Sequence, residues 1–443
     1  MRFKKMNKYK LLMLSLLAMS FQGMAQNDYN LQELVQLALE ENYQIQITKN
    51  QEEIAENRNT LGNAGFFPAF DIYSDQNWNI ETSESNLYTG QIRKGNNVQS
   101  NQFNATAELN WTLFDGFRMF AKKDQLESLA KLGKMETKYY VEQTIADLAN
   151  IYYSLVKARK QLKVHQQSLN ISAYRLNLEK QKQNLGKGNT LFYQQAKVDY
   201  NNDSTIVLNQ QMTIQNKQIQ INRIINKAPL NPLSAMEETF EPDELARVDK
   251  LIETAMDNSQ DLERSRLEEM IAEASYKMEK ASRYPQVSVY GNYSYSEQES
   301  ELGLLESSQS HGSNFGIQVR FNLYDGGKKN IAIENAQIQK QNSSVAIDDK
   351  RASITAVLAQ LVTQYNSMRE QYHLLMENQK SSGKSLAIAR QQFEQGAING
   401  YEFRQTQLAH LQIQNKINEL EYNLRTLQID IYRISGTLSD NIM

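Results

Sequence analysis

Alternation of apolar and polar residues predicts four β-strands in this chain. In the clearest segment, every odd-numbered position from Phe103 to Leu113 is apolar, and the even-numbered positions between them are polar. A period of two places alternate side chains on opposite faces of a strand. Segments of about ten residues with one apolar face are typical of transmembrane β-barrels, although a half-buried soluble sheet shows the same pattern. The predicted strands span about 69–80, 103–114, 286–296 and 315–324.

Two much longer stretches are predicted to be helical. The chain has five prolines, and none lies between Pro68 and Pro229 or after Pro285. Residues 117–183 and 327–393 can therefore each form one helix of roughly 65 residues, about 100 Å long. A return helix follows each, and apolar residues alternately four and three positions apart from Ile413 to Ile434 predict a coiled-coil seam. With glycines at the turns, the prediction is two helical hairpins, 117–226 and 327–436.

These elements occur twice in the same order of helix, strand, strand and hairpin. When the chain is aligned with itself at a shift of 217 residues, Pro68 falls on Pro285. From Leu113 onward the shift is 210 residues, and the Leu-Phe-Asp-Gly that begins at Leu113 falls on the Leu-Tyr-Asp-Gly that begins at Leu323. The change predicts a loop between the strands that is seven residues shorter in the second copy. The first repeat covers residues 26–226, the second 248–443, and the segment 227–247 is a proline-containing linker.

The first 25 residues have the pattern of a secretory signal peptide. Five Lys and Arg residues precede or flank the start of a short apolar run at 11–19, and Gly23 and Ala25 are the small residues before an expected cleavage at Gln26. The apolar run is too short to span a bilayer as a helix. No longer run follows, and the mean hydropathy is −0.63. If the mature chain enters a membrane, we therefore expect it to do so as β-strands.

Composition argues against several other functions. The absence of cysteine excludes disulfides, thiolate catalysis, cysteine metal sites and lipid attachment at an N-terminal cysteine. A net charge of −3 provides no basic surface for nucleic acid, and four scattered histidines lack metal-ligand spacing. Ser381 to Lys384 fits the Ser-x-x-Lys string and Ser439 to Asn441 the Ser-Asp-Asn string of serine acyl-enzymes, but no Lys-Thr-Gly follows. We expect no enzymatic activity, no cofactor and no metal site.

Together these features resemble the TolC-like outer-membrane efflux family over nearly the whole mature chain. The matching features are the signal peptide, Pro68 and Pro285 before strands, both Leu-x-Asp-Gly segments and the glycine turns, in duplicated order. The resemblance implies an α+β membrane protein with an internal two-fold repeat. In such proteins a trimeric 12-stranded transmembrane β-barrel, with four strands per chain, continues into a long periplasmic α-helical barrel. Four strands alone are too few to close a barrel.

The resemblance also implies a function and a location. Such proteins are the outer-membrane exit channels of tripartite efflux pumps or type I secretion systems in Gram-negative bacteria. They pass substrates from the periplasm or an inner-membrane transporter to the exterior. The implied partners are two further copies of the chain, a periplasmic adaptor (membrane fusion protein), the inner-membrane transporter and outer-membrane lipid. Two other protein classes fit less well, because an adaptor would have one hairpin and a coiled-coil scaffold would need no amphipathic strands.

Residues near the hairpin turns are the candidate site. In the family, an aspartate six residues past the second turn glycine lines a periplasmic constriction, and here that residue is Glu402; a second acidic position is Gln405. Glu402 also fits an ordinary first-turn carboxylate favoured by the helix dipole. The family's charged lock between subunits falls on Phe192 and Ile398, so we expect apolar packing there. The expected adaptor contacts are the turn residues Gly186, Lys187, Gly396 and Ala397.

The alternation also assigns faces to the strands. One face, expected to contact lipid, carries Leu109, Trp111, Val319 and Phe321, and the face expected to line the lumen carries Glu108, Asn110, Gln318 and Arg320. Aromatic residues near strand ends fit either a girdle at the membrane surface or ordinary sheet packing. They are Trp78, Trp111, Tyr293 and Tyr295.

Overall fold

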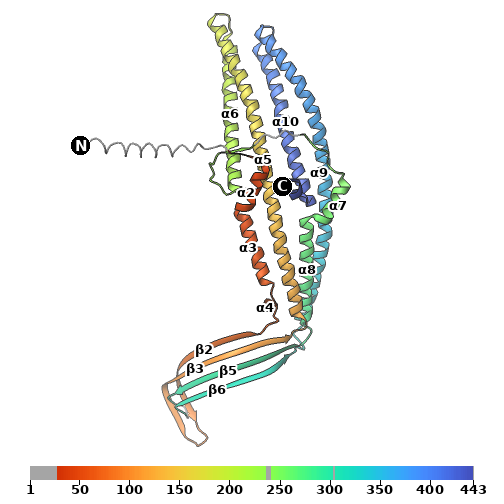
Figure 1. Cartoon of the computed structure of the whole chain (residues 1–443). Helices are drawn as coiled ribbons and strands as arrows, with labels where there is room; N and C mark the ends of the chain where they lie inside the picture. Colours follow the sequence, from red (N-terminus) through yellow and green to blue (C-terminus); the bar gives the residue numbers. More distant parts are fainter. Residues whose placement is uncertain (1–26, 236–240, 303–304, 443) are drawn as a thin grey trace, which may run out of the picture. The chain divides into compact units, whose positions relative to one another are not determined.

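The structure is a computed structural model that describes residues 27–235, 241–302 and 305–442. The expected signal peptide, residues 1–25, lies outside these ranges. The chain divides into two units. The hairpin unit contains 137–260, 351 onward and the residues up to 48, and the sheet unit contains 49–136 and 261–350. Two helices run through both units, α5 (Arg118–Asn184) and α9 (Lys328–Glu394), and each begins and ends within one residue of the range predicted (Figure 1). No helix in the described ranges is both long and apolar enough to cross a bilayer.

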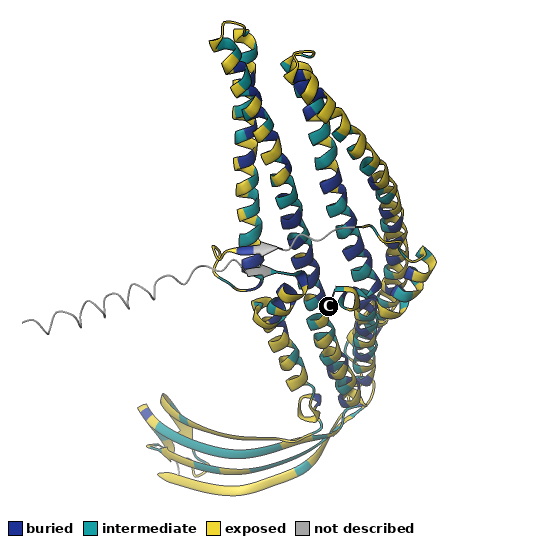
Figure 2. Ribbon diagram, turned by 45° about the horizontal axis from the view of Figure 1, so that its top comes forward, coloured by how far each residue is buried: buried dark blue, intermediate teal, exposed yellow. Residues whose placement is uncertain are grey.

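The hairpin unit is built from return helices and a small mixed layer. Helix α6 (Thr190–Ile224) follows α5, and α10 (Gly400–Ser435) follows α9. Helices α2 (Leu31–Glu41), α7 (Val248–Asn258) and α11 (Leu438–Ile442) pack beside them, and α3 (Tyr43–Arg58) begins in this unit. Strand β1 (Asn27–Tyr29) pairs in parallel with β4 (Leu233–Ala235). The core lies around this mixed layer, where residues coloured as buried are concentrated on the helices in Figure 2. Its fully buried members include Leu34, Tyr152, Ile221, Leu233 and Leu438.

The sheet unit contains a four-stranded antiparallel sheet in the order β2-β3-β5-β6, together with helices α4 (Leu61–Ala64) and α8 (Gln260–Ala281). The strands are β2 (Ala69–Asn86), β3 (Ile92–Phe114), β5 (Gln286–Ser300) and β6 (Ser307–Arg320). Their register sorts the side chains by face. One row across the sheet is Phe70, Leu109, Gly291 and Phe315, and the next row is Asp71, Glu108, Asn292 and Asn314. The sheet therefore has one apolar and one polar face. Within one chain, the edge strands β2 and β6 are mostly exposed, and the inner strands β3 and β5 are mostly half-buried.

Strands β2 and β3 are longer than the alternation predicts. Strand β2 continues to Asn86 and β3 already begins at Ile92, and a turn that contains Gly90 at φ 82° joins them. Residues 81–102 are mainly polar on both faces, so the pattern gave no signal there. The backbone ladder holds this part, with a cross-strand ion pair between Glu84 and Lys94 at 2.8 Å. The extra residues of the first repeat thus lengthen its strands, whereas a longer loop was predicted.

The predicted end of the fourth strand was wrong. Strand β6 ends at Arg320, and residues 321–324 lie outside any strand. Arg320 pairs with Gln286, the first residue of β5. Pro285 precedes Gln286 and has no N–H, so the ladder cannot continue. Phe321, assigned above to a lipid-facing strand position, therefore lies past the end of the strand, where the Lys329 ammonium is 6.0 Å from its ring centre.

Candidate functional site at the ends of the helical hairpins

Glycine and asparagine define both hairpin turns. Gly186 follows the end of α5 at φ 69°, and Gly396 follows α9 at φ 75°, a left-handed conformation that glycine adopts without strain. Asn189 caps α6 and Asn399 caps α10, since each side-chain oxygen accepts a bond from a backbone N–H of the first turn. The residues expected to contact an adaptor, Gly186, Lys187, Gly396 and Ala397, are all exposed at these turns.

Glu402 is the third residue of α10 and completes a capping box with Asn399. The Asn399 backbone N–H donates to Glu402 Oε2 at 3.1 Å, and the Glu402 N–H donates to Asn399 Oδ1 at 3.0 Å. This pairing satisfies two helix N–H groups that would otherwise lack partners. The first-turn role considered from the sequence is therefore present. The side chain is also exposed, so a second role in lining a passage stays a prediction.

Phe192 and Ile398 lie in different surroundings within one chain. Phe192 lines a groove of about 580 Å³ between α5, α6 and α10, which Gln405, Tyr401 and Leu408 also line. Ile398 instead packs against a buried cluster in which the rings of Phe393 and Phe403 stack 5.0 Å apart. The structure thus brings together Phe192 and Gln405. A contact between Phe192 and Ile398 of different chains remains a prediction.

A buried network of ion pairs joins three helices beside this groove. The Arg404 guanidinium on α10 donates to both carboxylate oxygens of Asp203 on α6, at 2.8 and 2.9 Å. Asp203 is 4% exposed and also accepts bonds from the hydroxyls of Ser168 and Ser172 on α5. A second pair, Arg175 with Asp199, connects α5 to α6. Because bidentate, charge-assisted bonds fix geometry strongly, this network determines how the hairpin ends fit together.

Electrostatics keep Asp203 ionised. Burial raises the pKa of its carboxyl, but the hydrogen bonds from Arg404 and Ser172 and the positive charge of Arg404 lower it by more, so the net shift of the pKa is downward. Burial also lowers the pKa of His165, against the attraction of Asp203. The carboxylate is therefore stabilised in its charged form by its partners.

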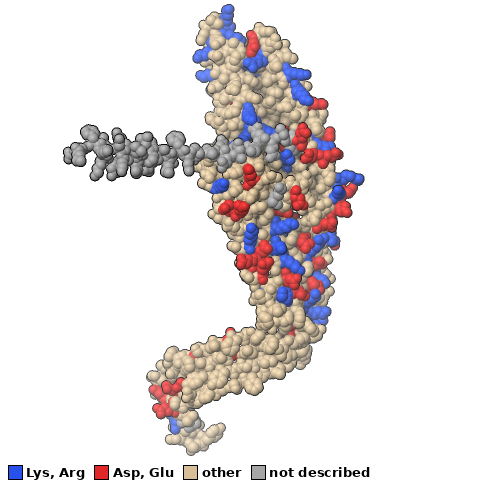
Figure 3. Space-filling model, viewed as in Figure 1, with Lys and Arg blue, Asp and Glu red and all other residues tan. Residues whose placement is uncertain are grey.

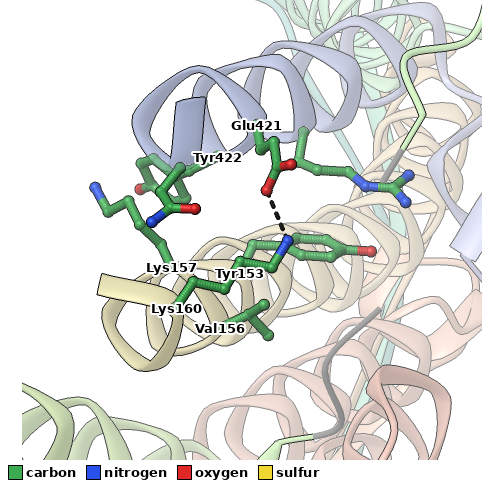
Figure 4. Close-up of a pocket in the computed structure, with 8 residues that line it drawn as sticks. Tyr153, Val156, Lys157, Lys160, Glu421 and Tyr422 are labelled. Atoms are coloured by element: carbon green, nitrogen blue, oxygen red, sulfur yellow. Dashed lines mark hydrogen bonds and ion pairs between the residues drawn. The ribbon is translucent and has the colours of Figure 1, made fainter. Parts of the chain in front are cut away.

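A second polar seam joins α5 to α10, which come from different repeats. Lys160 pairs with Glu421 at 2.6 Å, drawn as the dashed line in Figure 4. The Lys157 ammonium lies 4.1 Å from the centre of the Tyr422 ring, and Arg425 lies 5.3 Å from that of Tyr153. Cation–π contacts of this kind add to the ion pair. The seam holds the first helix of one hairpin against the second helix of the other.

The sequence did not reveal the four charged residues of the buried network. Asp199 and Asp203 are four positions apart and thus share a face of α6, which was the available signal. Their partners, Arg175 and Arg404, lie on other helices, and a pairing across helices cannot be read from spacing.

The histidines and Ser382 bear on the metal and acyl-enzyme chemistry considered from the sequence. No group of three histidine or acidic side chains among the described residues is arranged to hold a metal ion. Ser382, from the Ser-x-x-Lys string, has its Oγ 2.9 Å from His410 Nδ1 and 3.1 Å from the backbone oxygen of Gln379 on its own helix. Ser382 and His410 lie on the long helices α9 and α10, and the Lys-Thr-Gly string of serine acyl-enzymes does not follow in the sequence.

A family model and several solved structures match this chain. A sequence model described as outer membrane efflux protein matches residues 34–227 and 251–437. The fold is similar to the CmeC outer membrane channel of Campylobacter jejuni, with a TM-score of 0.78, 14% identity, and coverage of 94% of this chain and 89% of that one. It is also similar to the outer membrane protein VceC of Vibrio cholerae, with a TM-score of 0.72, 15% identity, and coverage of 92% of this chain and 96% of that one. A third similar structure is that of CusC, with a TM-score of 0.75, 16% identity and coverage of 92% of each chain. No curated protein sequence matched.

Proposed function

The chain belongs to the outer membrane efflux protein family, and from this premise we propose that three copies of it close the exit channel of a tripartite efflux pump or a type I secretion system. It is an outer-membrane channel subunit and not an enzyme. Members of the family form homotrimeric channels that work with periplasmic adaptors and inner-membrane pumps. For this chain, the proposed partners are an adaptor, a transporter, the lipid of the outer membrane and two further copies.

The open edges of the sheet carry the proposal. Strands β2 and β6 each pair on one side only. Every pair is antiparallel, so β2 and β6 run in opposite directions, and β6 of one copy can pair antiparallel with β2 of the next. Such a head-to-tail contact generates a ring when the rotation closes. Two copies would give eight strands, which side chains fill, whereas three give twelve and leave a lumen.

Exposed apolar positions on the helices support the same ring. On α6, Leu191, Val198 and Met212 recur at multiples of seven residues, and on α9, within the sheet unit, Ile331, Ile338 and Val345 do the same. A spacing of seven returns to one helix face and is typical of helix–helix seams. Since all six side chains are exposed in one chain, neighbouring copies are the occupants that would bury them.

The faces of the sheet support a position in a bilayer. The apolar row with Phe70, Leu109 and Phe315 would contact lipid, and the polar row with Asp71 and Glu108 would line the lumen. At the periplasmic end, the exposed Glu402 and Gln405, with Phe192 and Ile398, would surround the constriction. The exposed turns at Gly186, Lys187, Gly396 and Ala397 would receive the adaptor.

Cysteine cross-linking tests the ring directly, because the natural chain has no cysteine. Ser74 on β2 shares a face with His311 on β6 through the sheet register, as do Gln309 and Ser313 two residues either side. Three variants each combine Ser74→Cys with one of Gln309→Cys, His311→Cys or Ser313→Cys. The variant whose two cysteines face each other between neighbouring chains should give covalent dimers and trimers and nothing larger. Each single variant is the matched control and should stay monomeric on denaturing gels, since β2 never meets another β2. A ladder beyond three chains, or cross-linking of single variants, would refute the ring.

A further inference from the structure

Exposed aromatic and basic side chains meet where the strands of the sheet unit give way to helices. The aromatic rings form a connected group, with Phe66 and Phe120 5.0 Å apart and Phe117 and Tyr284 6.4 Å apart between ring centres. Trp111 joins them through a bond from its indole N–H to the Phe66 carbonyl at 2.9 Å. Phe117, Phe120 and Tyr284 are each at least half exposed. This end of the sheet therefore presents amphipathic rings to the surroundings.

Basic side chains lie directly on the helix side of these rings. We define the basic collar as Arg118, Lys122, Lys123, Arg283, Lys328 and Lys329. It draws on the starts of α5 and α9 and the residue two positions after α8, so both repeats contribute. Arg283 and Asn330 connect two of these segments at 3.5 Å. In Figure 3, Lys and Arg occur together with Asp and Glu over the helical part of the sheet unit, whereas the visible face of the adjoining strands has little charge until its far end, where charged residues, mainly acidic, gather.

No collar residue takes part in an ion pair within the described chain. Their hydrogen-bond acceptors are neutral: Lys123 donates to Asn59 Oδ1, and Lys329 donates to the Asn322 carbonyl. The pKa of Glu127, one turn further along α5, is lowered by the hydrogen bond from Lys131 and also by the positive charge of Lys123. The nearby carboxylates Asp115 and Asp325 accept bonds from backbone N–H groups at the helix starts. Arg118, Lys328 and Lys329 lie in the first turns of α5 and α9, where the helix dipole disfavours cations, so these three are placed there at a cost in helix stability. An external anion would offset that cost.

From this arrangement we propose that the basic collar binds the headgroups of anionic phospholipids in the leaflet that faces the helices. The inference rests on the proposed function, because the sheet must first span the membrane. Amphipathic rings occupy the level between hydrocarbon and headgroups, so cations one turn further lie at the level of the lipid phosphates. The partner is therefore a lipid surface with net negative charge, continuous with the lipid-facing side of the sheet.

The test compares the lipids retained by two charge-matched variants. The mature protein is reconstituted into bilayers of phosphatidylethanolamine with phosphatidylglycerol, extracted gently, and its bound lipids are quantified by mass spectrometry. The collar variant carries Arg118→Gln, Arg283→Gln and Lys328→Gln. The control carries Lys180→Gln, Lys197→Gln and Lys384→Gln, which remove the same charge from exposed positions in the hairpin unit. Phosphatidylglycerol enrichment should fall by about fivefold for each collar cation removed and stay unchanged in the control.

Any other result would refute lipid binding by the basic collar. Equal enrichment in the collar variant and the wild type would overturn the proposal, as would an equal loss in both variants, which would indicate an effect of net charge alone. A wild-type channel that inserts without preferring phosphatidylglycerol would refute the collar and leave the channel standing. A wild-type chain that does not insert at all would refute the channel and the collar together.

Discussion

Removing Asp203 should locally destabilise the hairpin ends far more than removing any exposed carboxylate. In Asp203→Leu, the Arg404 guanidinium loses both of its carboxylate bonds while its side chain stays 12% exposed. Breaking one side of a buried pair costs about 3–5 kcal/mol. At 1.4 kcal/mol per factor of ten, this raises the local opening constant by about 10²–10⁴. Amide hydrogen exchange of peptides from α6 and the start of α10, followed by mass spectrometry, measures that constant.

Two further variants separate charge from packing. The double variant Asp203→Leu with Arg404→Met removes both charges, so its cost should fall to about 1–2 kcal/mol, chiefly for the lost bonds from Ser168 and Ser172. Glu394→Gln removes a carboxylate from the exposed pair with Arg390 at the same hairpin end, where the two side chains are 42% and 59% exposed. Its effect should stay below about 1 kcal/mol. If the single variant costs no more than Glu394→Gln, or the double variant costs as much as the single one, the account of the buried pair is wrong.

The same pair predicts a pH dependence of defined sign. The pKa of Asp203 is lowered from its ordinary value of 3.8 in the folded chain, so folding favours the ionised form. Its contribution to stability is full above about pH 4 and is lost as the pH falls through the lower folded-state pKa. The difference in thermal midpoint between wild type and Asp203→Asn should be constant from about pH 7 to pH 5 and shrink below about pH 4. A difference that shrinks above pH 5 would contradict this reasoning and indicate that His165 titrates there.

Three further predictions concern other parts of the chain. An alanine in the left-handed conformation costs roughly 1–2 kcal/mol. Gly116→Ala should reduce stability by well over this amount, because its Cβ would lie 2.4 Å from the Ala281 carbonyl oxygen. The Cβ of the repeat-related Gly326→Ala would meet nothing within 4 Å, so this variant should lose only roughly 1–2 kcal/mol in urea unfolding. Phe315→Arg on the apolar face should cost about 2–4 kcal/mol per chain in membrane-refolding titrations, and Asn314→Arg on the polar face far less; equal tolerance would mean that the sheet is not in a bilayer. Glu402→Gln should reduce cation selectivity in planar bilayers while stability falls by at most about 1 kcal/mol through the capping box, and a loss of stability with unaltered selectivity would exclude the carboxylate ring.

The sequence predicted the parts of the fold that one-dimensional patterns determine. The span from Phe103 to Leu113 was recognisable because one face of the strand is apolar. Helices α5 and α9 were recognisable because no proline interrupts them. Residues 81–102 gave no such signal, since a hydrogen-bonded ladder between two polar faces does not require alternation. The end of β6 depended on its pairing with Gln286 beside Pro285, which only the sheet register shows.

The candidate site was less predictable because it depends on contacts between helices. The capping box of Asn399 and Glu402 is local, and its chemistry was foreseen as one of two roles for Glu402. The bonds from Arg404 to Asp203 join positions 201 residues apart. They exist only because α5, α6 and α10 meet at this end of the hairpin unit. The neutral residues Phe192 and Gln405 line the groove beside that network, and nothing in their spacing indicated the ion pairs.

The central claim is that three chains close one channel, and the mass of the conducting assembly tests it most directly. Native mass spectrometry of the mature protein, released from the same detergent used for planar-bilayer recordings, should give three chains per particle. The trimer fraction alone should conduct. A stable monomer that conducts ions, or a conducting assembly with a different number of chains, would contradict the account.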